Sequence, residues 1–421
     1  MQYWPRSCLP ALKPLKRLCR MNPEVLPEHT APDFEFDYID IGSVFLAAGI
    51  VGRERLTFAN APSRARKPVQ TGDIIISTVR TYLRAITRIG EEDDGAVVST
   101  GFAVCRANRV MEPSFLFRAM QSEPFIEQVV AASTGVSYPA INPTTLGNIS
   151  LPCPDLPTQR RIADFLDRET ARIDLLIEKK QRLVALLGEK HFADLESLTF
   201  PEGMPASELV PFRWICRIVE GQIDPTSEPW KNRALIAPNH IESKTGRLLT
   251  TETAEEQSAI SGKYAFGPGT VLYSKIRPAL AKACISPRTG MCSADMYPIT
   301  PDRRLRAEYL LMQLLSARFI DWATLQSMRV AMPKINRETL GGFRLRVPPL
   351  DTQDRFVQSF ANKRAQFEMV TDKINVSIDR LKEYRSALIT AAVTGQIDVD
   401  SHTRSGATDR RLDDIQEELG A

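Results

Sequence analysis

The chain has 421 residues, of which 43% are hydrophobic and 25% are charged, and this composition excludes a disordered or fibrous protein. At roughly 100 to 200 residues per domain, the length predicts several folded units. The most apolar stretch, residues 42–52, is shorter than the roughly 20 residues that cross a bilayer, and the N-terminus lacks a secretion signal. We therefore expect a cytoplasmic protein with no membrane-spanning helix. The formal net charge of +3 says little about partners.

The cysteines and histidines predict neither a metal site nor a disulfide framework. Seven cysteines form no CxxC pair, and four histidines stand apart from other metal-ligating residues. The cofactor and catalytic elements of an adenine methyltransferase, the Walker pattern of a nucleotide motor and the local signatures of nucleophilic enzymes are also missing. We expect no catalytic residue, no metal and no cofactor.

An internal repeat organises the whole chain. Residues 125–161 align without a gap to residues 319–355 at a shift of 194, with 16 identical positions of 37. Upstream, GDIIISTVR (residues 72–80) and GTVLYSKIR (residues 269–277) share the pattern G-x4-S-x2-R at a shift of 197. One structural unit is therefore written twice.

Each copy predicts the same elements in the same order. Short β-branched runs in residues 72–105 and 271–276 indicate strands, and the spacing of apolar residues in 113–132 and 307–325 indicates helices. A proline-rich junction, LPCPDLP or VPPLD, then precedes a long helix free of proline. The predicted fold class is α+β, with two mixed α/β domains in a tandem pseudo-repeat separated by two long helices. The expected parts are a first domain (1–157), a central helix (158–200), a second domain (201–350), a C-terminal helix (351–399) and a poorly ordered polar tail (400–421).

Both long helices carry apolar residues at the alternating spacing of three and four that is typical of a coiled coil. At ~1.5 Å per residue each helix is about 60 Å long, too long to pack fully on one small domain, so we expect the two seams to pair. Glu169, Lys180, Lys363 and Ser377 interrupt the seams. The alternative of two helices that each pack on their own domain stays open. The predicted interface residues are Ile162, Leu166, Ile173, Leu176, Leu183, Leu187, Phe360, Phe367, Ile374, Leu381 and Leu388.

Positive charge gathers in both domains beside the G-x4-S-x2-R element. Residues 263–346 carry 14 Lys and Arg against 5 Asp and Glu, a surplus of nine, and residues 53–88 carry eight against two. Such clusters are typical of proteins that neutralise phosphates, as a DNA clamp does. The alternative, ordinary solvated surfaces, explains either cluster alone but not its recurrence.

The junctions and long helices resemble the specificity subunit of type I restriction-modification systems. The resemblance rests on LPCPDLPTQRRIADFLDRETARIDLLIEKKQRLVALLGE and on the closing RLKEYRSALITAAVTGQIDV, and it covers roughly residues 12–399. It implies two target-recognition domains that each read half of a bipartite site in double-stranded DNA. It also implies that the helices pair antiparallel as a ruler and dock two adenine-N6 methyltransferase subunits, and that a motor-endonuclease subunit can join.

Candidate DNA-contacting residues lie beside the repeated elements. Arg80, Arg84, Lys275 and Arg277 are the predicted phosphate anchors. The predicted base readers precede the shared Ile-Asn pair and differ between the copies, which implies an asymmetric target; they are Ser137, Tyr138, Arg329 and Lys334. The asparagines of that pair, Asn142 and Asn336, we interpret as turn or cap residues.

Two rival functions remain open at this point. One is a self-sufficient DNA methyltransferase or nuclease, which the missing motifs disfavour. The other is a coiled-coil interaction scaffold without DNA binding.

Overall fold

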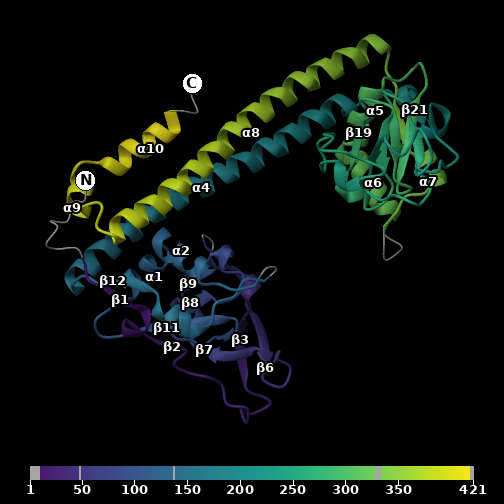
Figure 1. The fold of residues 1–421 in the computed structure, drawn as a ribbon. Coiled ribbons are helices and arrows are strands. Elements are labelled where there is room, and N and C mark those ends of the chain that lie inside the picture. The colour runs from purple at the N-terminus through teal and green to yellow at the C-terminus, as the bar shows by residue number, and fades with distance from the viewer. Residues whose placement is uncertain (1–9, 47–48, 136–137, 328–332, 418–421) are drawn as a thin grey trace. The chain divides into compact units, whose positions relative to one another are not determined.

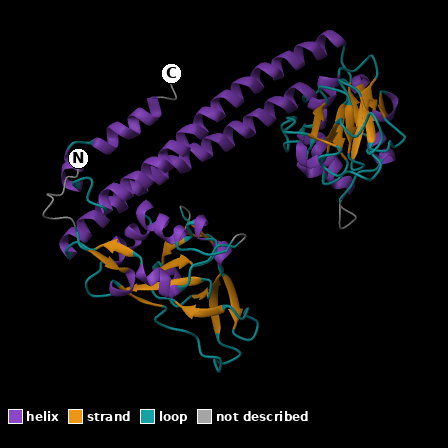
Figure 2. Ribbon diagram, viewed as in Figure 1, coloured by secondary structure: helices purple, strands orange, loops and turns teal. Residues whose placement is uncertain are grey.

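The computed structural model describes residues 10–46, 49–135, 138–327 and 333–417. The chain forms two compact units: unit 1 contains Met1–Arg182 and Lys373–Ala421, and unit 2 contains Leu183–Asp372. The two longest helices, α4 (Leu156–Thr199) and α8 (Leu350–Val393), each contribute to both units. Figure 1 labels elements in both units, α4 and α8 among them, and Figure 2 shows the same view coloured by secondary structure.

Unit 1 contains two four-stranded sheets with the orders β6-β3-β10-β7 and β2-β11-β8-β9. Two smaller pairs, β1-β12 and β4-β5, complete it. In the first sheet β3 and β10 run parallel, whereas the strands of the second sheet are antiparallel. The strand bounds are β1 Leu12–Pro14, β2 Cys19–Met21, β3 Glu35–Ile39, β4 Val44–Phe45, β5 Gly49–Ile50, β6 Glu54–Thr57, β7 Ala65–Pro68, β8 Ile74–Ser77, β9 Ile86–Arg88, β10 Val97–Ser99, β11 Phe102–Ala107 and β12 Ser150–Pro152.

Unit 2 repeats this topology. Its four-stranded sheets have the orders β16-β15-β20-β17 and β14-β21-β18-β19, and β13 pairs with β22 as β1 does with β12. Among the described strands of unit 2, the parallel pair is again in the first sheet, between β15 and β20. The strand bounds are β13 Leu209–Pro211, β14 Cys216–Ile218, β15 Ala234–Ile236, β16 Glu252–Thr253, β17 Tyr264–Phe266, β18 Val271–Ser274, β19 Ala283–Ile285, β20 Gly290–Cys292, β21 Met296–Pro301 and β22 Arg344–Arg346.

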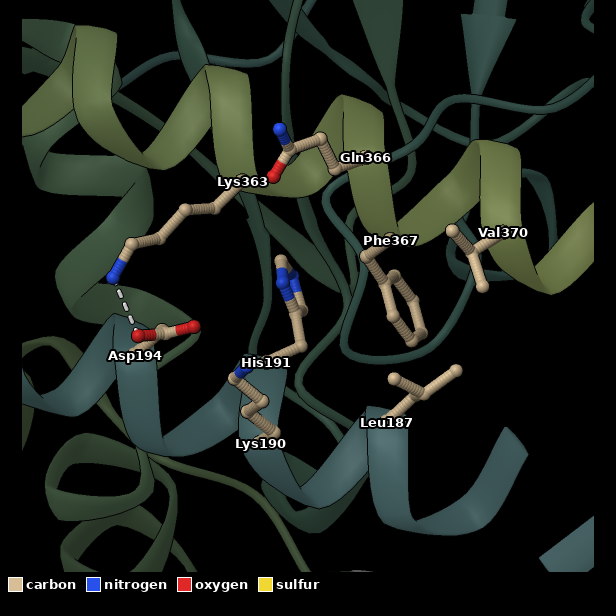
Figure 3. Close-up of a pocket in the computed structure, with 8 residues that line it drawn as sticks. All are labelled: Leu187, Lys190, His191, Asp194, Lys363, Gln366, Phe367 and Val370. Atoms are coloured by element: carbon tan, nitrogen blue, oxygen red, sulfur yellow. Dashed lines mark hydrogen bonds and ion pairs between the residues drawn. The ribbon is translucent and has the colours of Figure 1, made fainter. Parts of the chain in front are cut away.

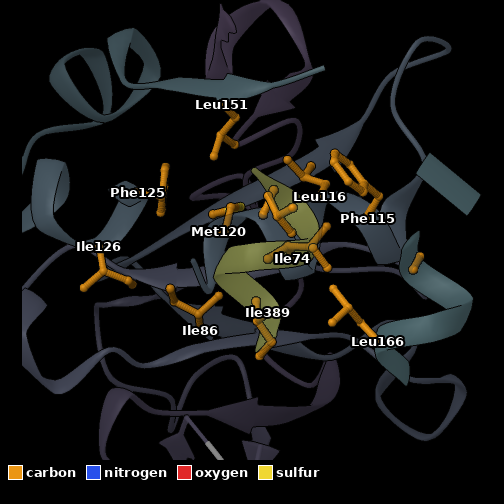
Figure 4. Packing of buried hydrophobic residues seen from close by; sticks show 14 of the residues in the cluster. Ile74, Ile86, Phe115, Leu116, Met120, Phe125, Ile126, Leu151, Leu166 and Ile389 are labelled. Atoms are coloured by element: carbon orange, nitrogen blue, oxygen red, sulfur yellow. The ribbon is translucent and has the colours of Figure 1, made fainter. Parts of the chain in front are cut away.

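Short helices pack on the antiparallel sheet of each unit, and the N-terminal part of α4 joins the core of unit 1. Strand β8 is buried along its whole length, as its continuous apolar run favours. Figure 4 shows Ile74 of β8 and Phe115 of α1 in one cluster with Leu166 of α4 and Ile389 of α8. The short helices are α1 Pro113–Met120, α2 Glu123–Ala131, α3 Pro143–Asn148, α5 Ala307–Leu314, α6 Ala317–Ser327 and α7 Arg337–Gly342. Among the described helices, none combines the length and apolarity that a membrane span requires.

The long helices pack together and run in opposite directions. In unit 1, Arg385 of α8 forms an ion pair of 2.9 Å with Asp174 of α4. In unit 2, Lys363 of α8 forms one of 2.5 Å with Asp194 of α4. Later residues of α4 therefore contact earlier residues of α8, which shows that the helices are antiparallel. The predicted fold class, with two mixed domains and an antiparallel pair of long helices, is confirmed.

Burial along the predicted seams is uneven. In unit 1 the residues from both helices are buried, except for Leu176, which is half-buried. In unit 2, Phe360 is buried and Leu187 and Phe367 are half-buried, but 46% of Leu183 is exposed. The buried seam residues of unit 1 are Ile162, Leu166, Ile173, Ile374, Leu381 and Leu388. Part of this burial comes from the domain core, because Ile162 and Leu166 belong to the same cluster as the β8 residues.

The C-terminal tail is helical, contrary to expectation. Residues 400–421 were expected to be poorly ordered, but the structure contains α9 (Val399–Arg404) and α10 (Ala407–Glu417) there. Val399, Leu412 and Ile415 are buried in the unit 1 core, and Asp409 forms an ion pair with Arg172 of α4. A few apolar residues at helical spacing are enough to dock an otherwise charged helix.

Candidate nucleic-acid interface

The G-x4-S-x2-R element forms the same tight loop in both units. The chain leaves β8 or β18 and enters one short 3-10 turn, Thr81–Leu83 or Pro278–Leu280. The shared serine fixes the start of the loop, because its Oγ donates to the carbonyl two residues later. The distances are 2.6 Å from Ser77 to Val79 and 3.1 Å from Ser274 to Ile276.

Left-handed residues flank this turn on both sides in both units. Arg80 has φ 50° and Arg84 has φ 53°, while Arg277 has φ 48° and Ala281 has φ 43°. For residues with a side chain this conformation costs ~1–2 kcal/mol each. Such strain is typical of functional sites, where the surrounding structure holds the backbone in place.

A second segment, distant in sequence, lies beside each loop. The Arg80 N–H donates to the Pro139 carbonyl at 2.7 Å, and the Arg277 N–H donates to the Pro333 carbonyl at 2.8 Å. The predicted readers Tyr138 and Lys334 are thereby brought next to the predicted anchors. Of the other predicted readers, Ser137 and Arg329 lie outside the described residues.

In unit 1 the loop presents an arginine stacked on an aromatic ring. The Arg80 guanidinium lies 4.7 Å from the centre of the Tyr138 ring, and 65% of Tyr138 is exposed. Tyr82 and Leu83 of the same loop are also exposed. A cationic group and exposed rings on one loop suit contact with phosphates and bases.

Arg84 makes contacts of a different kind. Its guanidinium donates two hydrogen bonds to the Glu123 carboxylate, at 2.5 and 2.9 Å. Glu123 also accepts from the Ser386 hydroxyl of α8 at 2.7 Å. The hydrogen bond from Arg84 lowers the pKa of Glu123. These contacts favour a structural role for Arg84, because its charge is already neutralised.

In unit 2 the loop is cationic, and among the described residues no tyrosine of the loop itself stacks on an arginine. Arg277 and Lys334 are exposed, and Lys275 is half-buried with its Nζ 5.6 Å from the centre of the Tyr297 ring. Leu280 is partly exposed at the turn. The two units therefore display different side chains on the same backbone frame.

Within the described residues, no group of histidine, cysteine or carboxylate side chains is arranged to hold a metal ion. A comparison with protein-family models matches residues 62–185 to the type I restriction modification DNA specificity domain. This match contains the loop, the segment beside it and the first part of α4. Over residues 62–185 the chain is therefore similar to the type I specificity family.

Two relatives have similar sequences, and one solved structure has a similar fold. The specificity subunit of the type I restriction enzyme EcoDI from Escherichia coli is 26% identical over 321 residues, which are 68% of this chain and 71% of that protein. The HindI specificity subunit from Haemophilus influenzae is 30% identical over 125 residues, 29% of this chain and 27% of that protein. A chain from a solved type I restriction-modification system has the same fold, with a TM-score of 0.72 and 23% identity over 93% of this chain and 100% of that one.

The residues shared by both copies of the repeat have structural roles. Asn142 and Asn336 are N-caps of α3 and α7, and each accepts a hydrogen bond from the backbone three residues later, at 2.8 and 2.7 Å. This agrees with their interpretation as cap residues.

The shared glutamines anchor the two long helices, a role that was not predicted. Gln159 accepts from the Glu112 N–H at 2.8 Å and donates to two backbone carbonyls. Gln353 accepts from the Arg306 N–H at 2.9 Å and also donates to two carbonyls. The sequence signal that could have predicted this role is that a glutamine occupies the same position in both copies of the repeat.

The helix pair lines an open cavity of about 480 Å³ in unit 2. Figure 3 shows Lys363 reaching Asp194 on one side and Phe367 beside His191 on the other. The His191 and Phe367 rings are stacked, with centres 4.8 Å apart, and burial lowers the pKa of His191.

The same face is covered by the tail in unit 1. At the shift of 194, Gln366 and Lys363 of the cavity correspond to Arg172 and Glu169. Arg172 contacts Asp409 of α10. The matching positions of the two long helices therefore have different surroundings: the tail helix α10 in unit 1 and an open cavity in unit 2.

Proposed function

We propose that the chain is the DNA-reading specificity subunit of a type I restriction-modification complex. Each recognition domain, 1–157 and 201–350, reads one half of an asymmetric bipartite site in double-stranded DNA. The chain supplies recognition, and partner subunits supply methylation and, where a motor-endonuclease subunit is present, cleavage. This proposal needs no cofactor or metal on the chain itself.

The observation that carries the proposal is the duplicated loop with unlike side chains. The two loops have the same backbone frame but carry different side chains, Arg80 with Tyr138 in one domain and Lys275 with Arg277 in the other. This difference supports the proposal that each domain reads its own half-site. Backbone phosphates are contacted by cations, and bases are distinguished by the side chains beside them. Different half-sites follow from different side chains.

Docking of two adenine-N6 methyltransferase subunits on the long helices is supported by their exposed apolar side chains. Leu175, Leu183 and Leu186 of α4 are each about half exposed, as are Met369 and Val376 of α8. Large exposed apolar residues at regular helical spacing favour a protein partner. The family resemblance, rather than the surface itself, identifies that partner.

Exchange of one recognition domain tests the proposal. In the assembled methyltransferase, residues 205–345 are replaced with the equivalent domain of a relative, and methylated adenines are mapped in host DNA. One half of the motif should change and the other should stay. A change in both halves, or no methylation that depends on the chain, contradicts the proposal.

The rival functions give different results with the wild-type chain. A self-sufficient enzyme methylates or cleaves DNA without partners, whereas this chain should do neither. A scaffold without DNA binding does not retain DNA in a complex, whereas retention by this chain should fall steeply as salt rises.

A further inference from the structure

Unit 2 contains a second cationic feature besides the loop that carries Lys275 and Arg277, namely a cavity lined by arginines. Its volume is about 370 Å³, and its lining includes Arg213, Arg217, Glu220 and Arg337. Arg213 belongs to the short turn Phe212–Trp214, Arg217 to β14, and Arg337 to the first turn of α7. Among these lining residues are three arginines and one glutamate, which gives the cavity a surplus of two positive charges.

The carboxylate is already engaged by one of the arginines. Arg337 forms an ion pair of 3.1 Å with Glu220 and donates to the Val219 carbonyl at 3.0 Å. Arg213 and Arg217 are exposed, and in the part of the chain that the structure describes neither side chain has a hydrogen bond or an ion pair. Like charges at one cavity repel one another, so a bound anion stabilises the arrangement.

This cavity continues the basic surface of the recognition loop in the same unit. The Arg337 guanidinium lies 5.5 Å from the centre of the Tyr297 ring, and Lys275 Nζ lies 5.6 Å from the same centre. Lys275 is two residues before Arg277 at the left-handed position of the loop. A cationic path therefore joins the loop to the cavity through one tyrosine.

Unit 1 keeps only part of this cluster among its described residues. At the shift of 197, Lys16 and Arg20 correspond to Arg213 and Arg217, but the Lys16 Nζ donates to Asn148 at 2.7 Å. At the shift of 194, Pro143 stands where unit 2 has Arg337. The set of three arginines therefore belongs to the second domain.

We propose that this cavity binds a backbone phosphate of the DNA duplex next to the half-site that the second domain reads. Planar guanidinium groups bind phosphate oxygens through paired hydrogen bonds. The site reads no base, so it adds affinity and fixes the register of the domain without changing the recognised sequence. The inference rests on the proposed function, because it assumes that unit 2 contacts DNA.

The test uses the assembled methyltransferase complex with the double variant Arg213→Gln and Arg217→Gln. Arg337 is kept because it packs against Tyr297. Binding to a duplex that carries the methylated site is measured by fluorescence anisotropy over a salt series. We expect roughly tenfold or more weaker binding at low salt. We also expect the dependence of log affinity on log salt to become shallower by about 0.9, the value for one lost phosphate contact. The methylated motif should stay the same.

The matched control is Arg17→Gln with Arg20→Gln, which removes two exposed arginines from the corresponding segment of unit 1. It should change affinity and salt dependence much less. Equal effects of both pairs overturn the site, because they indicate only a general effect of charge. The site is also overturned if the double variant keeps the salt dependence of the wild type while Arg277→Gln weakens binding. In that case only the phosphate site fails, and the proposed function stands. If the wild-type complex does not retain DNA, the proposed function itself fails.

Discussion

Replacing Gln353 with leucine should destabilise unit 2 by removing the anchor of α8. Gln353 is fully buried, and its side chain makes three hydrogen bonds of 2.8 to 2.9 Å to backbone groups around the start of the helix. Leucine has a similar size but makes none of them. Each buried backbone group left unsatisfied costs about 1–3 kcal/mol, so the free energy of unfolding should fall by about 3 kcal/mol or more.

Urea unfolding followed by tryptophan fluorescence measures this loss. Trp322 of α6 reports on unit 2, because its ring centre lies 4.9 Å from that of Phe343 in the core of that unit. With a slope of about 2 kcal/mol per molar urea, the midpoint should fall by about 1.5 M. The control is Gln358→Leu, an exposed glutamine five residues further along α8. A loss below about 1 kcal/mol, or an equal loss in the control, would refute the role of Gln353 as an anchor.

Three further predictions concern the contacts of unit 1 and the helix pair. Because Arg84 lowers the folded-state pKa of Glu123, this ion pair stabilises the fold fully above the ordinary value of 4.5 and is lost as pH falls through the lowered value. The difference in unfolding free energy between the wild type and Glu123→Gln should therefore shrink in acid. Four residues inserted after both Gln181 and Asn375, which match at the shift of 194, should lengthen each helix by about 6 Å and the gap between methylated half-sites by one or two base pairs, at about 3.4 Å per base pair. An unchanged gap in an active variant would show that the helices are not the ruler. A chain that stops after Asp398 loses the buried residues of α9 and α10, so hydrogen exchange in the unit 1 part of α4 should accelerate, whereas removal of only the last four residues should leave it unchanged.

The duplicated architecture was predictable because its signal is local and written twice. The β-branched run before Ser77 and its counterpart before Ser274 became the central strands β8 and β18, and the proline-rich junctions preceded the long helices as expected. The alternative, in which each helix packs on its own domain, describes part of the structure, because Leu166 of α4 packs in the core of unit 1. Periodicity identifies an apolar face but not everything that covers it.

Contacts between distant segments were not predictable from one sequence. The partner of Arg84 is Glu123, 39 residues later, and nothing in either local pattern indicates the pair. The tail looked disordered because charged residues outnumber the few apolar ones, yet Leu412 and Ile415 dock it. The cavity at Arg213 is also assembled from separate elements, so its three arginines appear in the sequence only as scattered charge.

The left-handed arginines carry a consequence for anyone who wishes to retarget this protein. Glycine adopts the conformation of Arg80 and Arg277 without strain, so the backbone alone does not require arginine there. Replacing either residue with glycine keeps the loop while removing its guanidinium group, which separates the shape of the loop from its chemistry. The loop has the same shape in both domains, where the hydrogen bonds of Ser77 and Ser274 fix its start. Side chains on the loop can therefore be exchanged without redesign of the backbone. Libraries that vary the exposed loop positions and leave the serines intact should therefore explore new DNA targets on an unchanged scaffold.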